Sequence, residues 1–396
     1  MKYKLFGRKI NYIFILLVVI TGLLNVMAWN STSFCDWYIA NVFPIWVNTY
    51  GRLTGMFPFS VGEWLIAAGL VITLIAFVSG IALIFCRRSK AGKVFSKICQ
   101  GYVWIVAVVC LVMTLNCMIL YHASPFSEQY FQQDDGEYSA TELMTLYQQV
   151  VTECNALCEE ILRDENGKVI YTGMTDDLLG ASEKEIQMAM ADEARLVMRK
   201  LGEDYPKLDG WYPRPKAMFF SDFMCQQHMK GYYFPFSMEA NYNDVMHLIN
   251  FPSTMCHELA HLRGYIFEDE ANLIGYLACM ESEDAFFRYS GNLSVLTYIC
   301  NDLNKLKKNN PEQYQLALEE VSPVAVKKQV WADNIFVTDE EWERINQKAL
   351  LDTDLVDKAA DVFVDTNLKI NGVSVGKVSY SRVVKLLLQY NRNKQK

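Results

Sequence analysis

The chain has 396 residues, of which 52% are hydrophobic and 21% charged, and its formal net charge is −8. This length leaves room for more than one structural region, and the acidic balance gives no support to a nucleic-acid-binding function. The hydrophobic excess lies in the first 121 residues, and the rest has the composition of an ordinary globular domain.

Three segments are apolar over the length that a transmembrane helix needs, which is about 20 residues. They are residues 10–28, 64–85 and 103–120. The first would also suit a signal peptide, but no small-x-small cleavage site follows it and two further spans come later. We therefore expect a membrane domain at residues 1–121 and a second domain at residues 122–396.

Basic residues indicate how these spans are oriented. Lysine and arginine are concentrated in the N-terminal tail and in residues 87–97, between the second and third spans. The loop between the first and second spans carries only Arg52 as a cation. Because basic loops stay in the cytoplasm, we expect a cytoplasmic N-terminus and an extracytoplasmic second domain.

The second domain is expected to be α+β, dominated by helices, with a small sheet. Amphipathic patterns predict helices at residues 140–163 and 182–201, the latter with a capping box of Ser182 and Glu185. Short aromatic runs predict strands at 216–221 and 232–236. Beyond residue 253 the patterns predict helices at 254–263, 267–288, 292–308, 311–321, 339–349, 354–369 and 380–391. Cys154 and Cys158 share one helix face, as free thiols or as a disulfide.

The motif His257-Glu258-Leu259-Ala260-His261 is the strongest chemical signal in the sequence. Residues four apart on a helix face the same way, so both imidazoles can hold one zinc ion. The glutamate between them then acts as the general base toward a zinc-activated water. Ser253 is expected to cap this helix at its start, and Gly264 to end it.

A catalytic zinc ion usually takes three protein ligands and leaves one position open. The helix expected next begins near Glu268, whose face also carries Ala271, Asn272 and Gly275. We predict Glu268 as the third ligand, with Glu270 as the alternative. Asn272, one turn on, is placed to hydrogen-bond a zinc-bound histidine.

HExxH followed by Glu-x-x-Ala-Asn resembles the gluzincin metallopeptidases. This resemblance implies His257, His261 and Glu268 as ligands and Glu258 as the general base, with Asn272 where many gluzincins have aspartate. It also implies an edge strand before the zinc helix that pairs with an extended peptide, here at Tyr233, Phe234 and Pro235, where an aromatic core strand is the alternative.

The whole chain resembles a bacterial family numbered 3810 among domains of unknown function. Its members are similar in having three N-terminal spans and an external zincin-like domain. The matching segments are residues 58–63, 235–241, 257–261, 268–277, 289–291, 367–372 and 379–380. This resemblance implies the architecture and leaves the substrate undefined.

Two further groups of residues are candidates for the site. Tyr289 is our candidate for the donor that stabilises the oxyanion, with Arg288, His228 and His247 as alternatives. Glu239, Asn241 and Asn243 either line the cleft or form a turn.

These features predict a membrane-anchored zinc peptidase whose substrates are peptides or proteins of the cell envelope. The alternative is a non-catalytic sensor or scaffold that keeps zinc for stability. The oligomeric state is not predicted.

Overall fold

The computed structural model describes residues 8–86, 89–132, 137–173, 178–349, 351–370 and 382–394. They form two compact units. The first, here called the membrane unit, consists of Met1–Ala123 together with Phe234–Glu239. The second, here called the globular unit, consists of Ser124–Tyr233 and Ala240–Lys396. The family matches at residues 371–372 and 379–380, and the first two residues of the predicted helix at 380–391, lie outside the described residues.

The membrane unit contains three helices that are long and apolar enough to cross a membrane, as predicted. The candidate spans are Tyr12–Asn30, Val61–Cys86 and Lys90–His122. The first is as long as predicted and begins two residues later, whereas the second and third begin earlier and end later than predicted. They lie in α1 (Arg8–Asn30), α5 (Val61–Cys86) and α6 (Lys90–Met113), and the last is continued by a π-helical turn at Thr114–Met118 and a 3-10 turn at Leu120–His122. The short helices α2 (Thr32–Asn41), α3 (Phe43–Trp46) and α4 (Arg52–Gly55) and a π-helical turn (Val47–Gly51) connect α1 to α5.

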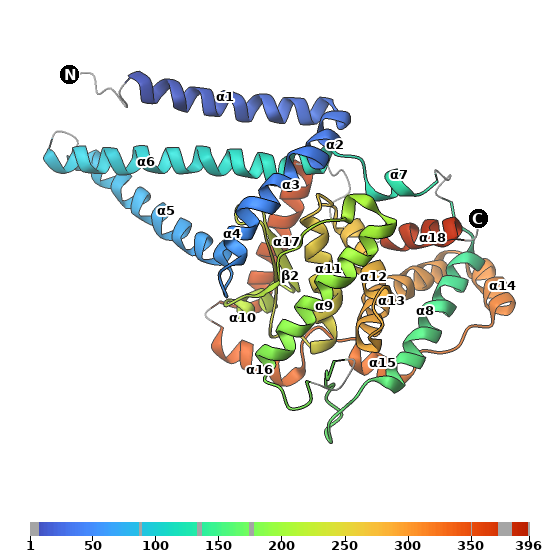
Figure 1. Ribbon diagram of the computed structural model, residues 1–396. Helices are drawn as coiled ribbons and strands as arrows, with labels where there is room; N and C mark the ends of the chain where they lie inside the picture. The colour runs from blue at the N-terminus through green and yellow to red at the C-terminus, as the bar shows by residue number, and fades with distance from the viewer. Residues whose placement is uncertain are drawn as a thin grey trace. The chain divides into compact units, whose positions relative to one another are not determined.

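Helix α6 packs against both other spans in Figure 1. The Asn25 side chain on α1 donates a hydrogen bond of 2.8 Å to Thr114 Oγ1 at the end of α6. Hydrogen bonds of this kind hold apolar helices together where no hydrophobic force acts between them.

The globular unit is dominated by helices, as the sequence predicts. Its two long N-terminal helices both begin with a capping box, formed by Ser139 with Glu142 and by Ser182 with Glu185. Its helices are α7 (Phe126–Tyr130), α8 (Ala140–Glu160), α9 (Glu183–Asp204), α10 (Ser221–Gln226), α11 (Phe251–His261), α12 (Glu268–Met280), α13 (Ala285–Asn309), α14 (Pro311–Val321), α15 (Lys328–Asp333), α16 (Asp339–Lys348), α17 (Thr353–Ile370) and α18 (Arg382–Lys394), and its 3-10 turns are Pro206–Leu208 and Leu248–Asn250. Cys154 and Cys158 are buried free thiols on α8.

A three-stranded sheet has the strand order β1-β3-β2. Strand β1 (Lys216–Ala217) pairs in parallel with β3 (Glu239–Tyr242), and Lys216 is opposite Asn241. Strand β2 (Gly231–Phe234) is an edge strand, and a short turn joins it to β3, so these two strands run in opposite directions.

The strand predictions were right in kind and wrong in extent. The predicted strand at 216–221 ends at Ala217, because α10 begins at Ser221. The sequence interpretation missed β3, since Glu239 and Asn241 suggested a cleft or a turn. Both side chains are at most 1% exposed in β3.

One predicted helix boundary was also wrong. The helix expected at 267–288 stops at Met280, and α13 begins at Ala285 with Asp284 as its N-cap. The sequence placed the break at residues 289–291, where Gly291 suggests a stop. Gly291 instead lies inside α13, where an added Cβ would come within 2.6 Å of Cys279 Cβ. This glycine therefore permits close helix packing and does not end a helix.

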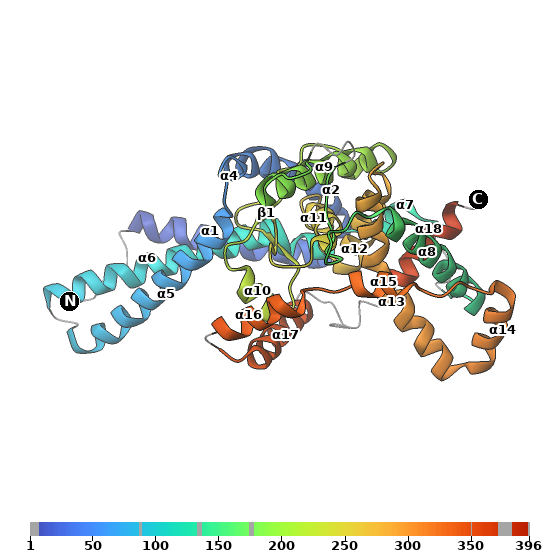
Figure 2. The same cartoon turned by 90° about the horizontal axis from the view of Figure 1, so that it is seen from below.

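Helices α11, α12 and α13 lie side by side and form the centre of the globular unit (Figures 1 and 2). The close approach of α12 to α11 depends on Gly275. A Cβ added there would lie 3.1 Å from the Ser253 carbonyl oxygen and 3.2 Å from the His257 nitrogen. The small face predicted for this helix is thus the face that contacts α11.

Candidate metal centre

The motif helix α11 begins and ends on local signals. Its N-cap is Asn250 and Pro252 lies in its first turn, where a missing N–H costs nothing. The prediction of Ser253 as the cap was therefore wrong, because the helix starts earlier than expected. The helix ends at His261, and Gly264, with φ of +90°, reverses the chain soon after, as predicted.

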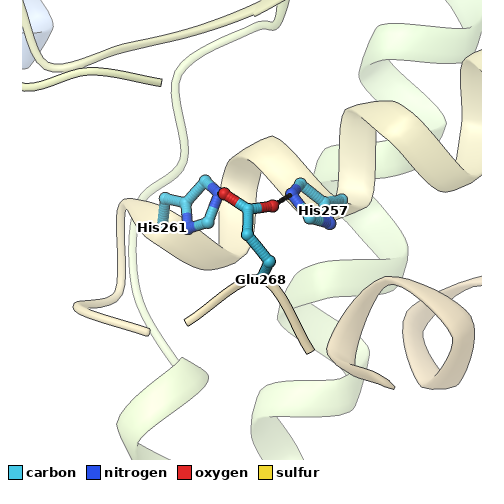
Figure 3. Close-up of side chains that lie close together, drawn as sticks. All are labelled: His257, His261 and Glu268. Atoms are coloured by element: carbon cyan, nitrogen blue, oxygen red, sulfur yellow. Dashed lines mark ion pairs between the residues drawn. The ribbon is translucent and has the colours of Figure 1, made fainter. Parts of the chain in front are cut away.

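His257, His261 and Glu268 converge on one point (Figure 3). One ligand atom from each lies within 4.8 Å of the other two. Glu268 Oε2 is 3.1 Å from His257 Nε2, and Glu268 Oε1 is 3.9 Å from His261 Nε2. The two histidines come from α11 and the glutamate from the first residue of α12. The structure thus brings together the three residues that the sequence spacing predicts to lie close to one another.

The far ring nitrogen of each histidine is occupied by an oxygen acceptor. His257 Nδ1 lies 3.0 Å from Asn272 Oδ1, and His261 Nδ1 lies 2.7 Å from the carbonyl oxygen of Tyr265. An acceptor at Nδ1 requires the proton there and leaves the Nε2 lone pair directed toward the centre. Each imidazole, when neutral, therefore presents its Nε2 lone pair to the centre.

The two alternatives for the third ligand point in different directions. Glu268 points between the histidines, with 43% of its side chain exposed. Glu270 is 3% exposed and accepts the backbone N–H of Ser127 at the start of α7. Since its carboxylate is engaged with α7, the geometry favours Glu268.

The charges at the centre are mutually dependent. Burial by itself would lower the pKa of His257, but the carboxylate of Glu268 outweighs it and raises this pKa to about 9. Burial would raise the pKa of Glu268, yet the hydrogen bond from His257 and its charge lower it to about 2. Burial, with the charge on His257 adding to it, lowers the pKa of His261 to about 4. A metal-free centre at neutral pH therefore holds the Glu268 carboxylate between one imidazolium, His257, and one neutral imidazole, His261.

Glu258 lies beside the three candidate ligands but is not one of them. Its side chain is 6% exposed, and Oε1 is 3.9 Å from His257 Nε2. Burial raises the pKa of Glu258 to about 8. Among the described residues, none hydrogen-bonds Glu258 Oε2. A buried carboxyl with an unsatisfied oxygen and a pKa near neutrality has the properties of a general base.

Strand β2 runs along the motif helix. A Cβ added at Gly231 would come within 2.5 Å of Glu258 Oε1, so only glycine allows the strand this close. Two residues further, the Tyr233 ring lies 5.9 Å from the His261 ring, centroid to centroid. Alternate residues of a strand face the same side, so Gly231 and Tyr233 both face α11.

The other two predicted substrate-binding residues belong to the membrane unit. Phe234 packs against Phe236 with ring centroids 5.5 Å apart, and the carbonyl oxygen of Pro235 accepts a hydrogen bond from Asn116. Of the predicted trio, only Tyr233 lies in the globular unit with the metal centre.

Tyr289 is placed elsewhere. Its hydroxyl donates a 2.7 Å hydrogen bond to Asp333 Oδ2, and burial with this bond raises the pKa of Tyr289. The side chain therefore belongs to a different polar cluster. The prediction assumed a helix start after residue 291. The true start at Ala285 places Tyr289 inside α13.

The alternative oxyanion donors also have other contacts. Arg288 donates to the Ser282 and Glu283 carbonyl oxygens, and His228 packs against Trp342. His247 donates its backbone N–H to the Phe336 carbonyl oxygen, and burial lowers the pKa of its ring.

Two contributors to the centre were missed by the sequence interpretation. Gly231 carries only a weak signal, a glycine just before an aromatic strand. The Tyr265 carbonyl carries none, since any residue has one and only the reversal at Gly264 brings it back to His261.

The donor set suits zinc. Bonds of about 2.0–2.2 Å in a tetrahedral site hold donor atoms about 3.3–3.6 Å apart. The two His–Glu separations of 3.1 and 3.9 Å lie on either side of this range. Two imidazoles, one carboxylate and one remaining position form the ligand pattern of catalytic rather than structural zinc.

Comparisons with known proteins identify the family alone. Neither the curated proteins nor the solved structures contain a match to this chain. One family model, described as "Protein of unknown function (DUF3810)", matches residues 38–388, which include the last two candidate spans and the metal centre. The chain therefore belongs to this protein family of unknown function.

Proposed function

We propose that the protein is a membrane-anchored zinc metallopeptidase of zincin type. The observation that carries this proposal is the convergence of His257, His261 and Glu268 beside the buried, unsatisfied carboxyl of Glu258. Zinc held by these three side chains would polarise a substrate carbonyl and lower the pKa of a water molecule.

Glu258 is the general base in this proposal. With a pKa raised to about 8 in the metal-free chain, it exchanges protons readily near neutral pH. A cation in the adjacent site favours its ionised form, which takes a proton from water and later passes it to the leaving amine. Asn272 and the Tyr265 carbonyl keep the two imidazoles oriented meanwhile.

An extended peptide is the substrate class that the surroundings favour. Strand β2 is an edge strand and passes over Glu258 at Gly231. A peptide added to such an edge binds through backbone hydrogen bonds and needs few specific side-chain contacts. Tyr233, two residues further along this strand, lies with its ring beside His261.

The basic segments around the first and third spans support an extracytoplasmic location for the globular unit. Anchoring would confine hydrolysis to a layer close to the membrane, so peptides and proteins of the cell envelope are the expected substrates.

The test compares the purified full chain with its Glu258→Gln variant, both loaded with zinc. Zinc content is measured by elemental analysis and activity on a mixed peptide library by mass spectrometry. We expect about one zinc per chain in both proteins, and peptide cleavage in the parent only. A general base contributes about 10²–10⁴-fold, so the variant should lose at least a hundredfold.

Two results would contradict the proposal. Absence of stoichiometric zinc in the parent chain removes the metal centre. Zinc in both proteins, with no cleavage by the parent, favours the sensor or scaffold, for which Glu258 has no chemical role.

A further inference from the structure

The turn between β2 and β3 is held by the membrane unit, to which residues 234–239 belong. Three separate segments of that unit bond to it. The Thr54 hydroxyl at the end of α4 donates to the Ser237 carbonyl oxygen at 2.8 Å. The Asn116 side chain in the π-helical turn donates to the Pro235 carbonyl oxygen at 2.8 Å.

The third attachment is made by a carboxylate at the start of α5. Glu239 Oε1 accepts the Val61 N–H at 3.1 Å, and Oε2 accepts the Gly62 N–H at 2.7 Å. The first N–H groups of a helix have no partner within it and carry positive partial charge, so both attract a carboxylate. Glu239 is 1% exposed, which protects these two bonds from water.

The fit at this point is close. A Cβ at Gly62 would overlap the Phe234 ring, so only glycine lets α5 begin here. Met238 has φ of +55°, which L-residues other than asparagine and aspartate rarely adopt. Such a conformation persists only where the surroundings fix it. Here the Met238 N–H donates to the Phe234 carbonyl oxygen at 2.8 Å, and the three attachments hold the rest of the turn.

The strand leading into this turn is the one beside the catalytic carboxyl. Strand β2 has only four residues, from Gly231, next to Glu258, to Phe234, where the turn begins. A strand this short makes few backbone hydrogen bonds to β3, so its position also depends on how the turn that follows it is held. Of the three attachments of this turn, the one at Glu239 is made by a carboxylate.

We propose that Glu239 is a positioning residue: by holding the turn between β2 and β3, it fixes the edge strand that the peptide binds. This inference rests on the proposed peptidase function and adds that the membrane spans act as more than an anchor. Peptide binding by β2 then depends on an intact start of α5, and a fragment lacking the spans binds substrate poorly even with zinc in place.

The experiment uses the full chain and its Glu239→Gln variant. Glutamine has the same shape, but an NH2 group replaces one of the two acceptor oxygens. This NH2 group would face the backbone N–H of Val61 or Gly62, and two donors cannot form a hydrogen bond with each other. The matched control is Glu185→Gln, because Glu185 also accepts a backbone N–H, from Ser182 at 2.8 Å, at the exposed start of α9. Thr54→Val, which removes one hydroxyl from the same turn, is a milder second variant.

Three experiments are carried out on each protein. The first measures zinc content, the second measures KM and kcat on the peptide found with the parent chain, and the third measures hydrogen exchange of the amides at residues 231–242 without substrate. For Glu239→Gln we expect unchanged zinc, kcat within about twofold, KM raised about tenfold and faster exchange in β2. Thr54→Val should change KM and exchange in the same direction by less, and Glu185→Gln should change neither.

Unchanged exchange in β2, or an unchanged KM, in Glu239→Gln overturns the positioning role. If Glu239→Gln does not fold, the same two results in Thr54→Val overturn it. If the parent chain cleaves no peptide, the proposed function fails, and the exchange measurement still decides whether Glu239 holds β2.

Discussion

The Asp333 cluster and the metal centre are both buried in the globular unit, and they differ in how many hydrogen-bond donors their carboxylate oxygens have. Asp333, 3% exposed, accepts two hydrogen bonds from Arg163, at 2.8 and 2.7 Å, and one from the Tyr289 hydroxyl. Gln329 adds another at 3.1 Å. The negative charge of Asp333 is thus paired with the guanidinium of Arg163, and its oxygens accept hydrogen bonds from Arg163, Tyr289 and Gln329.

The metal centre lacks this balance. Glu258 is as deeply buried as Asp333, yet its Oε2 has no partner among the described residues, and burial together with the negative charge of Glu268 raises its pKa. Within the described parts of the chain, the cation paired with Glu258 and Glu268 is His257, which is charged only while it keeps a proton. A buried carboxylate with a full set of donors is typical of a structural role. Two neighbouring carboxyl groups that lack donors are expected where a bound cation and a reactant supply the missing contacts.

The largest expected effect is the loss of zinc from His261→Ala. Removing a hydrogen-bond partner of a ligand costs about 10- to 100-fold in metal affinity, and removing the ligand itself should cost more. Elemental analysis after dialysis should find about one zinc per chain in the parent and close to none in the variant. Equal zinc in both would show that the ion binds elsewhere.

The Asp333 cluster should respond in the opposite way. Asp333→Ala leaves the Arg163 guanidinium and the Tyr289 hydroxyl without their shared acceptor. Breaking a buried ion pair in this way costs about 3–5 kcal/mol, so the free energy of unfolding should fall by that amount while zinc content stays the same. Denaturant unfolding of the full chain in detergent, followed by circular dichroism, measures the change.

Asp192→Ala is the control for this variant. Asp192 is 46% exposed on the surface and pairs with Arg214 at 2.6 Å. Exposed pairs contribute about 0–1 kcal/mol, so this substitution should have little effect. If Asp333→Ala is no more destabilising than Asp192→Ala, or if it removes zinc, the contrast between the two clusters is wrong.

The contrast also explains what the sequence could predict. Spacing of three or four residues on a helix places side chains on one face, and this was enough for His257 with His261 and for Glu268 with Asn272. The capping boxes at Ser139 and Ser182 depend on residues three apart and are equally local. Where both side chains lie on one face of the same helix, the sequence contains the information.

Contacts between distant segments were beyond this kind of inference. Tyr289 follows the motif closely in the chain, yet its partner Asp333 lies 44 residues further on. Gly231 reaches Glu258 only because β2 runs along α11. Strand β3 is polar in sequence and buried in structure, so its composition resembles a turn. In each case packing, which the local pattern does not record, decided the outcome.

The smallest expected effect is a pH dependence of zinc affinity that only the metal centre should show. In the metal-free chain the pKa of His257 is raised to about 9 and that of Glu258 to about 8, while that of His261 is lowered to about 4. Zinc requires a neutral His257 and favours an ionised Glu258, so binding at pH 7 should release about one to two protons. His261 is already neutral and releases none.

The sign follows from these protonation states. Protons compete with zinc below the metal-free pKa values, so the apparent affinity should rise with pH by up to about tenfold per unit for each proton released, and level off near pH 9. Titration calorimetry at pH 7 in two buffers of different ionisation enthalpy counts the protons. Glu258→Gln should reduce the number without abolishing it, because His257 still loses its proton. A binding enthalpy independent of buffer would mean that no proton leaves, and that the His257–Glu268 ion pair does not exist in the metal-free protein.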